Sequence, residues 1–455
     1  MRCWLAVLGL LFVSPLAAQQ LSVRQALPSE AAIEAAAKEV ASLYKQEYEA
    51  AKTPLQRRAL AKKLFAEANS SPDDAAGRFA LLKVARKVAT GSGDIALLLE
   101  IVQRTEEDFA IRPGSLKAEA LDEIAPQLRL VPEWFLWGRE ADRTWPLLRA
   151  QGQWELASKL AKAAEAIAKK QRDTDLAKLW SERQRDVAAL TEADAPLVAA
   201  LARLENAPVD PVANQTAGTL LGTVRDDWPR AVPMLALSGD ATLSQLTVLE
   251  MSEPTQSAEL LQLADGWKNF ATDRSPLESA AVLRHALGFY QQAAARAGGL
   301  DQRRAQKEWQ DLFAVAMPDR FPLALITPAV RAVQNDFNPH VMTASVGGGK
   351  FSDSLWGHAF ATEPSRLGFE LPCECKYLVG MCALNDTGAQ PAGPAVFRVL
   401  SESRELWRSP PIGELGKLVP FKVDLRSNTR IELRVQGSGN SHDVHAVWVD
   451  PMLQK

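Results

Sequence analysis

The hydrophobic pattern of the chain changes near residue 320. Between residues 29 and 317, small and apolar residues recur at three- and four-residue spacing, which is typical of one face of an amphipathic helix. The clearest example is Trp154, Ala157, Leu160, Ala161, Ala164, Ile167 and Ala168. Capping residues beside prolines divide this region into helices of about 12 to 22 residues. They are Ser29, Thr53-Pro54, Ser71-Pro72-Asp73 and Ser275-Pro276.

Several helical segments are built alike. Residues 75–109 predict two helices joined by a Gly-Ser-Gly-Asp turn, and residues 213–237 and the stretch from Gly266 to Tyr290 repeat this arrangement. Paired helices with small residues at their contact resemble tetratricopeptide-type hairpins, whose repeat is ~34 residues. Gly218 and Gly266 lie 48 positions apart, so the period is not strict. The prediction is an α-solenoid or irregular helical array, and a plain helical-bundle spacer is the alternative.

Residues 366–449 follow a different period. Apolar and polar residues alternate strictly in 367–371, 419–425 and 431–435, which predicts half-buried antiparallel strands. The segments 377–384, 395–400 and 444–449 add further strands, separated by turns such as Asn385-Asp386-Thr387-Gly388. We expect a multidomain protein in which the helical repeat region precedes an all-β sandwich of roughly eight strands.

The first 18 residues have the pattern of a secretory signal peptide. Arg2 precedes an apolar run from Trp4 to Val13, and small residues end at Ala18. The run is too short to span a bilayer, which needs ~20 apolar residues, and no later segment predicts a membrane span. We expect an exported protein, periplasmic or extracellular, with four parts: residues 1–18, 19–130, 131–317 and 318–455. The formal net charge of −3 disfavours nucleic acid as a partner.

No nucleophile elbow, phosphate-binding loop, dinucleotide fingerprint or zinc-protease helix is present in the sequence. Because catalytic groups need only meet in space, this lowers the expectation of an enzyme without removing it.

Zinc is disfavoured because His442 and His445 have opposite parity on one strand and Cys373 and Cys375 are too close in sequence. Acidic loop residues would suit a structural Ca²⁺ or would simply be solvated: Asp336, Asp353, Asp386 and Asp443. No cofactor is predicted.

Three cysteines follow the signal segment. They predict either buried small residues or one disulfide, Cys375 with Cys382 or Cys373 with Cys382.

Four pieces of the last ~135 residues occur in a specific order. They are Trp356-Gly357-His358-Ala359 before the strand at 365–371, then 377–381, then 396–400 followed by 405–409, and finally 443–450. In this order they resemble the NPCBM family of carbohydrate-binding modules, which also occurs attached to family 98 glycoside hydrolases. The resemblance implies a galactose-binding-like jelly roll. The chain departs from the family at its closing Asp-x-His and at Cys373-Glu-Cys375-Lys.

Binding a sugar requires an aromatic face and a few polar groups, usually on loops at one end of a sandwich. The candidate carbohydrate-binding residues are Trp356, His358, Trp407, Asp443, His445 and Trp448. Parity places Asp443 and His445 on one face of the last strand and Trp448 on the other, so core packing is the alternative for Trp448. Four helical tryptophans predict either interface packing or an aromatic groove: Trp134, Trp137, Trp145 and Trp154.

The sequence favours a non-catalytic exported protein whose helical scaffold presents a module that binds glycans with galactose- or hexosamine-like ends. The alternative is an envelope scaffold that binds a protein partner through its helical repeats and has a jelly roll without a sugar. A cryptic glycan hydrolase is the least favoured function.

Overall fold

The computed structural model describes residues 24–71, 73–332, 340–359, 364–387, 393–425, 428–437 and 444–455. The predicted signal segment, Asp336 and Asp443 lie outside these residues. The helical part precedes an all-β sandwich, as predicted. Its helices are α1 Glu30–Leu43, α2 Lys45–Ala50, α3 Pro54–Ser70, α4 Ala75–Ser92, α5 Ile95–Asp108, α6 Ser115–Ile124, η1 Ala125–Gln127, α7 Val131–Ala150, α8 Trp154–Lys170, α9 Thr174–Asn206, α10 Pro211–Thr223, α11 Trp228–Ala236, α12 Ala241–Met251, α13 Ser257–Phe270, α14 Pro276–Arg296 and α15 Gly299–Ala316.

Three of the four predicted helix starts are confirmed. The side chains of Ser29, Thr53 and Ser275 each accept a hydrogen bond from a backbone N–H in the first turn of the following helix. The start predicted at Ser71 is wrong, because Ser71 is the C-cap of α3 and Asp74 caps α4 instead. The Asp74 carboxylate accepts from Gly77 N at 2.9 Å.

The helices pack as antiparallel neighbours. The turn between α4 and α5 contains Gly93 in the left-handed region (φ +75°), followed by the N-cap Asp94. Between α10 and α11, a Cβ on Gly218 would lie 2.7 Å from Leu235 Cγ, so only glycine allows this approach. Because α9 has 33 residues and α11 has nine, no fixed repeat length holds, and the tetratricopeptide detail remains a prediction.

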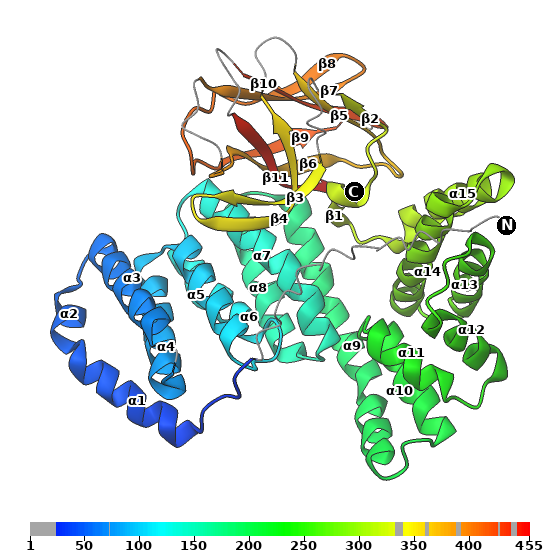
Figure 1. Ribbon diagram of the computed structural model, residues 1–455, viewed down its shortest axis with the longest axis horizontal. Coiled ribbons are helices and arrows are strands. Elements are labelled where there is room, and N and C mark those ends of the chain that lie inside the picture. Colours follow the sequence, from blue (N-terminus) through cyan, green and yellow to red (C-terminus); the bar gives the residue numbers. More distant parts are fainter. Residues whose placement is uncertain are drawn as a thin grey trace, which may run out of the picture.

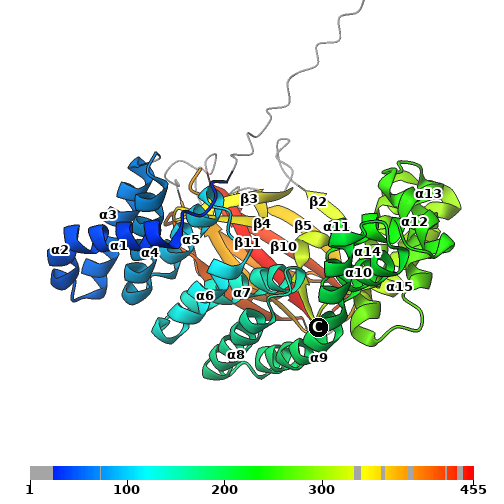
Figure 2. The same cartoon turned by 90° about the horizontal axis from the view of Figure 1, so that it is seen from below.

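Figures 1 and 2 show how the helices are arranged. Helices α1–α6 form one arm and α10–α15 another, while α7–α9 lie between them beneath the sandwich. None of the helices in the described part of the chain combines the length and the apolar character needed to cross a bilayer.

The sandwich consists of two antiparallel sheets, as the alternation predicted. The larger sheet has the order β3-β4-β11-β6-β9, with β1 paired to β11, and the smaller has the order β2-β5-β10-β7-β8. The strands are β1 Arg320–Pro322, β2 Val330–Ala332, β3 His340–Val346, β4 Gly349–His358, β5 Ser365–Glu370, β6 Tyr377–Leu384, β7 Ala395–Ser401, β8 Arg404–Arg408, β9 Val419–Asp424, β10 Arg430–Gly437 and β11 His445–Gln454; the short turn η2 Leu323–Leu325 follows β1.

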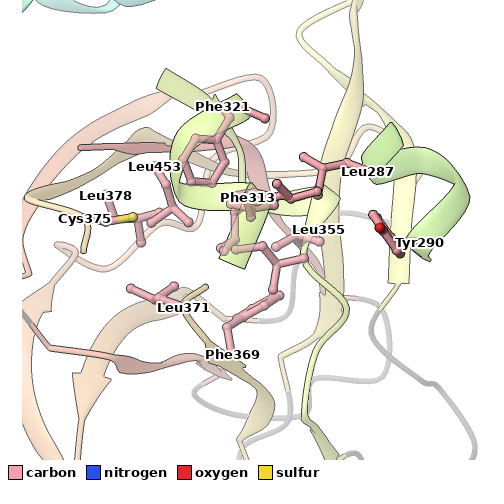
Figure 3. Packing of buried hydrophobic residues seen from close by; sticks show 14 of the residues in the cluster. Leu287, Tyr290, Phe313, Phe321, Leu355, Phe369, Leu371, Cys375, Leu378 and Leu453 are labelled. Atoms are coloured by element: carbon pink, nitrogen blue, oxygen red, sulfur yellow. The ribbon is translucent and has the colours of Figure 1, made fainter. Parts of the chain in front are cut away.

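The inner faces of the two sheets form one core. Trp448 packs against Phe397, Trp407 and Phe421, with ring centroids 5.2 to 6.3 Å apart. Figure 3 shows this core continuing through Phe369 and Leu453 to Phe313 of α15 and Leu287 of α14. The sandwich is therefore packed directly against the last helices.

The outer face of the six-stranded sheet is also covered. Met381, Val447 and Val449 belong to one hydrophobic cluster with Leu136 and Trp137 of α7, which lies beneath this sheet in Figure 1. The tip of the β3–β4 hairpin is held by the residues after β6. Asn385 Oδ1 accepts from Ser345 N at 3.0 Å, and Asp386 accepts from the backbone N–H groups at the hairpin tip at 2.9 Å.

Charged side chains join α7 to the covered sheet. A β-bulge between Val449 and Met452 holds Asp450 at φ +44° and directs its carboxylate to Arg139 and Arg143 of α7. Asp450 is 5% exposed, and burial raises its pKa against the opposing attraction of the two arginines. The Arg139 guanidinium also lies 4.3 Å from the centre of the Phe351 ring. Buried ion pairs are therefore part of this interface.

Candidate functional site

The candidate site lies where several strands begin or end. His445, the first residue of β11, is the direct cross-strand partner of His358, the last residue of β4. The last residue of β6, Leu384, lies beside Ala446. Antiparallel pairing thus brings residues 356–359 and the described residues 444–450 together in the six-stranded sheet. His445 lies on the face opposite to Trp448, as its parity in the strand predicted.

Three predicted site residues form an aromatic cluster on the outer face of this sheet. The ring centroids of Trp356 and His358 lie 5.1 Å apart, those of Trp356 and His445 5.6 Å, and those of the two histidines 4.9 Å. All three contacts are edge-to-face, with interplanar angles of 73 to 83°. Trp356 is 8% exposed and His358 is 3% exposed, whereas His445 is partly exposed. The two buried rings fix the orientation of His445.

Two polar residues after β6 border this cluster. Thr387 Oγ1 lies 3.3 Å from His445 Nδ1, and Asn385 N donates to His445 O at 2.8 Å. Asn385 is 1% exposed, and its Nδ2 has no hydrogen-bond partner among the residues that the structure describes. The sequence showed Asn385 and Thr387 only as turn residues. Their place beside His445 follows from strand pairing, which no local pattern contains.

The cluster offers hydrogen-bonding groups on His445 and Thr387, in front of the rings of Trp356 and His358, which are themselves buried. Exposed polar groups of this kind suit a ligand with many hydroxyl groups. Glycoside hydrolysis usually needs two carboxyl groups that flank the scissile bond. Asp386, which lies between Asn385 and Thr387 in the sequence, accepts hydrogen bonds from the backbone N–H groups of Gly347 and Gly348 instead.

The remaining predicted site residues lie elsewhere. Trp448 is 2% exposed and Trp407 is half-buried, and both pack in the core between the sheets. Asp443 lies outside the described residues, so its relation to His445 remains a prediction.

The four helical tryptophans do not share one groove. Trp137 is buried and donates to Leu121 O at 2.8 Å, and Trp145 packs edge-to-face on Trp180. Trp154 donates to Asp194 at 3.0 Å. Lys170 lies over the Trp134 ring at 5.5 Å. These contacts are interface packing.

The predicted disulfide between Cys375 and Cys382 is not formed, and all three described cysteines are free. Cys382 lies inside β6, seven positions along an extended chain from Cys375, which corresponds to roughly 20 Å. The Cys375 sulfur instead lies 3.8 Å from the Cys373 sulfur. A hydrogen bond from Cys375 lowers the pKa of Cys373 to about 7, and the same bond together with burial raises the pKa of Cys375. Burial raises the pKa of Cys382.

Within the described ranges, no three His, Cys, Asp or Glu side chains come together as metal ligands. Of the acidic residues considered for calcium, Asp353 pairs with Arg143, and Asp386 accepts from the hairpin tip. The described part of the chain thus gives no support to a calcium or zinc site.

Comparison with known proteins identifies the C-terminal part. Residues 327–454 match the NPCBM/NEW2 domain. No curated protein is similar enough in sequence to count as a relative.

Similar solved structures come from bacterial enzymes. A CBM51 of a Clostridium perfringens GH95 protein in complex with methyl-galactose is 14% identical, with 30% of this chain and 99% of that one covered and a TM-score of 0.26. The M60 catalytic domain with two CBM51 domains of Clostridium perfringens ZmpB is 16% identical, with 30% and 15% covered and a TM-score of 0.26. Tandem CBM51 modules of a Streptococcus pneumoniae family 98 glycoside hydrolase are 11% identical, with 32% and 49% covered and a TM-score of 0.27.

This chain thus spans only 15% of the ZmpB structure and about half of the tandem modules. The family match and the ordered sequence pieces agree on the same segment. Residues 327–454 are therefore an NPCBM domain, which follows the helical region.

Proposed function

We propose that this protein binds carbohydrate through its NPCBM domain without catalysing a reaction. The observation that carries the proposal is the cluster of Trp356, His358 and His445, which lies at the strand ends of a segment matching that domain. His445 and Thr387 supply exposed polar atoms, and Asn385 supplies a buried donor. Asp443 adds a carboxylate acceptor from the segment just before His445. The preferred ligands are glycans with galactose- or hexosamine-like ends.

The helical part is proposed as the scaffold that presents this domain. The division at residues 130 and 317, export through residues 1–18, and a periplasmic or extracellular location are further parts of the proposal. Direct packing of α7, α14 and α15 against the sandwich supports a rigid presentation, because hydrophobic contacts and ion pairs both cross the interface.

A glycan array probed with the full chain lacking residues 1–18 tests the proposal. We expect binding to a subset of glycans ending in galactose or a hexosamine. Replacing His445 by alanine is expected to weaken this binding about tenfold, because a hydrogen bond whose loss leaves a polar partner unpaired is worth ~1 to 3 kcal/mol and about 1.4 kcal/mol corresponds to a factor of ten. Lys417→Ala is the matched control, since Lys417 is an exposed residue of the same domain. An array without any bound glycan would remove the proposal.

The second candidate is a structural protein whose jelly roll binds no sugar. The covered outer face of the six-stranded sheet favours it, because that face is already packed against α7. A protein partner recovered by the full chain, together with a glycan array that stays empty, would select this function.

A further inference from the structure

The outer face of the five-stranded sheet carries a row of arginines. Arg434 of β10 is the direct cross-strand partner of both Arg366 of β5 and Arg398 of β7, and Arg398 is in turn the partner of Arg408 of β8. Four neighbouring strands thus place an arginine at the same level. With strands ~4.8 Å apart, the row is about 14 Å long.

This face lies on the side of the sandwich away from the helices in Figure 1. The side chains of Arg398, Arg434 and Arg408 are 30%, 24% and 53% exposed. In the neighbouring pair on the same face, the Arg430 and Glu370 side chains are 70% and 61% exposed. The row is therefore accessible to a large ligand.

The row has more positive charge than its own glutamates balance. Glu405 binds Arg408 through two hydrogen bonds of 2.9 Å, and Glu432 pairs with Arg434. Arg398 Nε lies 3.7 Å from Glu405, beyond hydrogen-bond distance, and Arg366 has no ion-pair partner among the described residues. Like charges directly opposite one another across strands are unfavourable. Among the described residues, the guanidinium groups of Arg366 and Arg398 therefore remain available to an anionic ligand.

The geometry of the Glu405–Arg408 pair shows which chemistry fits. A planar guanidinium matches a carboxylate through two parallel hydrogen bonds, and Arg408 already donates two such bonds to Glu405. A ligand with regularly spaced carboxylates can offer the same contact to Arg366 and Arg398 along the row. Nucleic acid fits less well, because the whole chain carries a net charge of −3.

We propose that this arginine row binds a carboxylated polysaccharide, one built from uronic acids, lying across the strands of the five-stranded sheet. The site is separate from the cluster at His445, which is on the other sheet. The proposal shares with the proposed function only the class of ligand, and either site can exist without the other.

Binding of the full chain without residues 1–18 to polygalacturonate tests the proposal, with the methyl-esterified polymer as the uncharged control ligand. We expect binding to polygalacturonate that weakens as salt is raised, because salt screens exposed charges, and no binding to the esterified polymer. The double variant Arg366→Gln/Arg398→Gln should bind at least tenfold more weakly, and His445→Ala should bind like the wild type.

The matched control is Arg404→Gln/Arg430→Gln, which removes the same charge from exposed positions of the same sheet. Circular dichroism melting curves establish that both double variants are folded. Equal weakening by the two double variants would show unspecific charge attraction and overturn the proposal. Absence of binding to polygalacturonate, or binding only to a sulfated galactan, would overturn it as well. Binding to polygalacturonate together with no binding on the neutral-glycan array would support the arginine row and contradict only the proposed site at His445.

Discussion

Asp450 on the six-stranded sheet and Glu370 on the five-stranded sheet both pair with arginine, yet the Asp450 side chain is 5% exposed and that of Glu370 is 61% exposed. The first pair lies between a sheet and α7, and the second lies on an open face. A buried charge needs its partner, because an unpaired charge in an apolar interface has lost its water. An exposed charge keeps its water and remains available to a ligand. The two outer faces of one sandwich thus have different roles: one holds the helices and the other faces solvent.

The largest expected difference between the faces is in stability. Asp450→Ala leaves Arg139 buried without this carboxylate and should lower the free energy of unfolding by ~3 to 5 kcal/mol. Glu370→Ala on the open face should lower it by less than about 1 kcal/mol. Urea denaturation of the full chain followed by tryptophan fluorescence measures both values. Equal effects of the two substitutions would contradict the distinction between the faces.

Replacing one glycine in each sheet by alanine tests the same difference between the sheets, with a smaller expected effect on stability. A Cβ on Gly380 of β6 would lie 3.1 Å from Pro451 Cα and 3.2 Å from Val449 O, which are backbone atoms beside the bulge. On Gly368 of β5 it would meet the Val330 side chain at 3.0 Å, and Val330 is 50% exposed on an edge strand. Gly380→Ala should therefore cost ~1 to 3 kcal/mol and Gly368→Ala less, because the three-residue edge strand β2 that carries Val330 can shift more easily than the backbone beside the bulge. Thermal unfolding of both variants tests the order, and a reversed order would show that the bulge yields more easily than β2.

The connection between the two sheets offers a chemical test. Cys373 lies between β5 and β6, and its pKa is lowered to about 7. Its rate of alkylation by iodoacetamide should rise with pH and reach half its maximum near pH 7, since the thiolate is the nucleophile. Cys375→Ala removes the hydrogen-bond donor and should move this midpoint toward or above the ordinary value of 9.0. Mass spectrometry locates the label, and an unchanged midpoint would show that Cys375 does not set the reactivity.

Local periodicity in the sequence predicted most of the secondary structure. Helices between residues 30 and 316, the strands β5, β6, β7, β9, β10 and β11, and the opposite faces of His445 and Trp448 were all visible in the pattern. The strands β3 and β4 were not predicted, because much of β4 is buried on both faces and does not alternate.

Contacts between distant parts of the chain were not visible. The ion pair of Arg143 with Asp450 joins positions 307 apart, and the bulge that directs Asp450 interrupts an otherwise regular strand. Of the two predictions for the cysteines, burial is confirmed for Cys375 and Cys382, and the disulfide between them is wrong. Extension of the chain through β6 separates Cys375 from Cys382, and the Cys375 sulfur lies next to that of Cys373 instead. Within the candidate site, the ordered sequence pieces predicted Trp356, His358 and His445. Asn385 and Thr387 could be added only from the structure, because strand pairing places them beside His445.

The most direct test of the carbohydrate proposal is titration calorimetry with the strongest ligand from the glycan array. We expect the wild-type chain to bind it at one site, His445→Ala to bind about tenfold more weakly, and Arg366→Gln/Arg398→Gln to bind a neutral glycan unchanged. Equal affinities of the wild type and His445→Ala would place the ligand elsewhere and contradict the site at the strand ends.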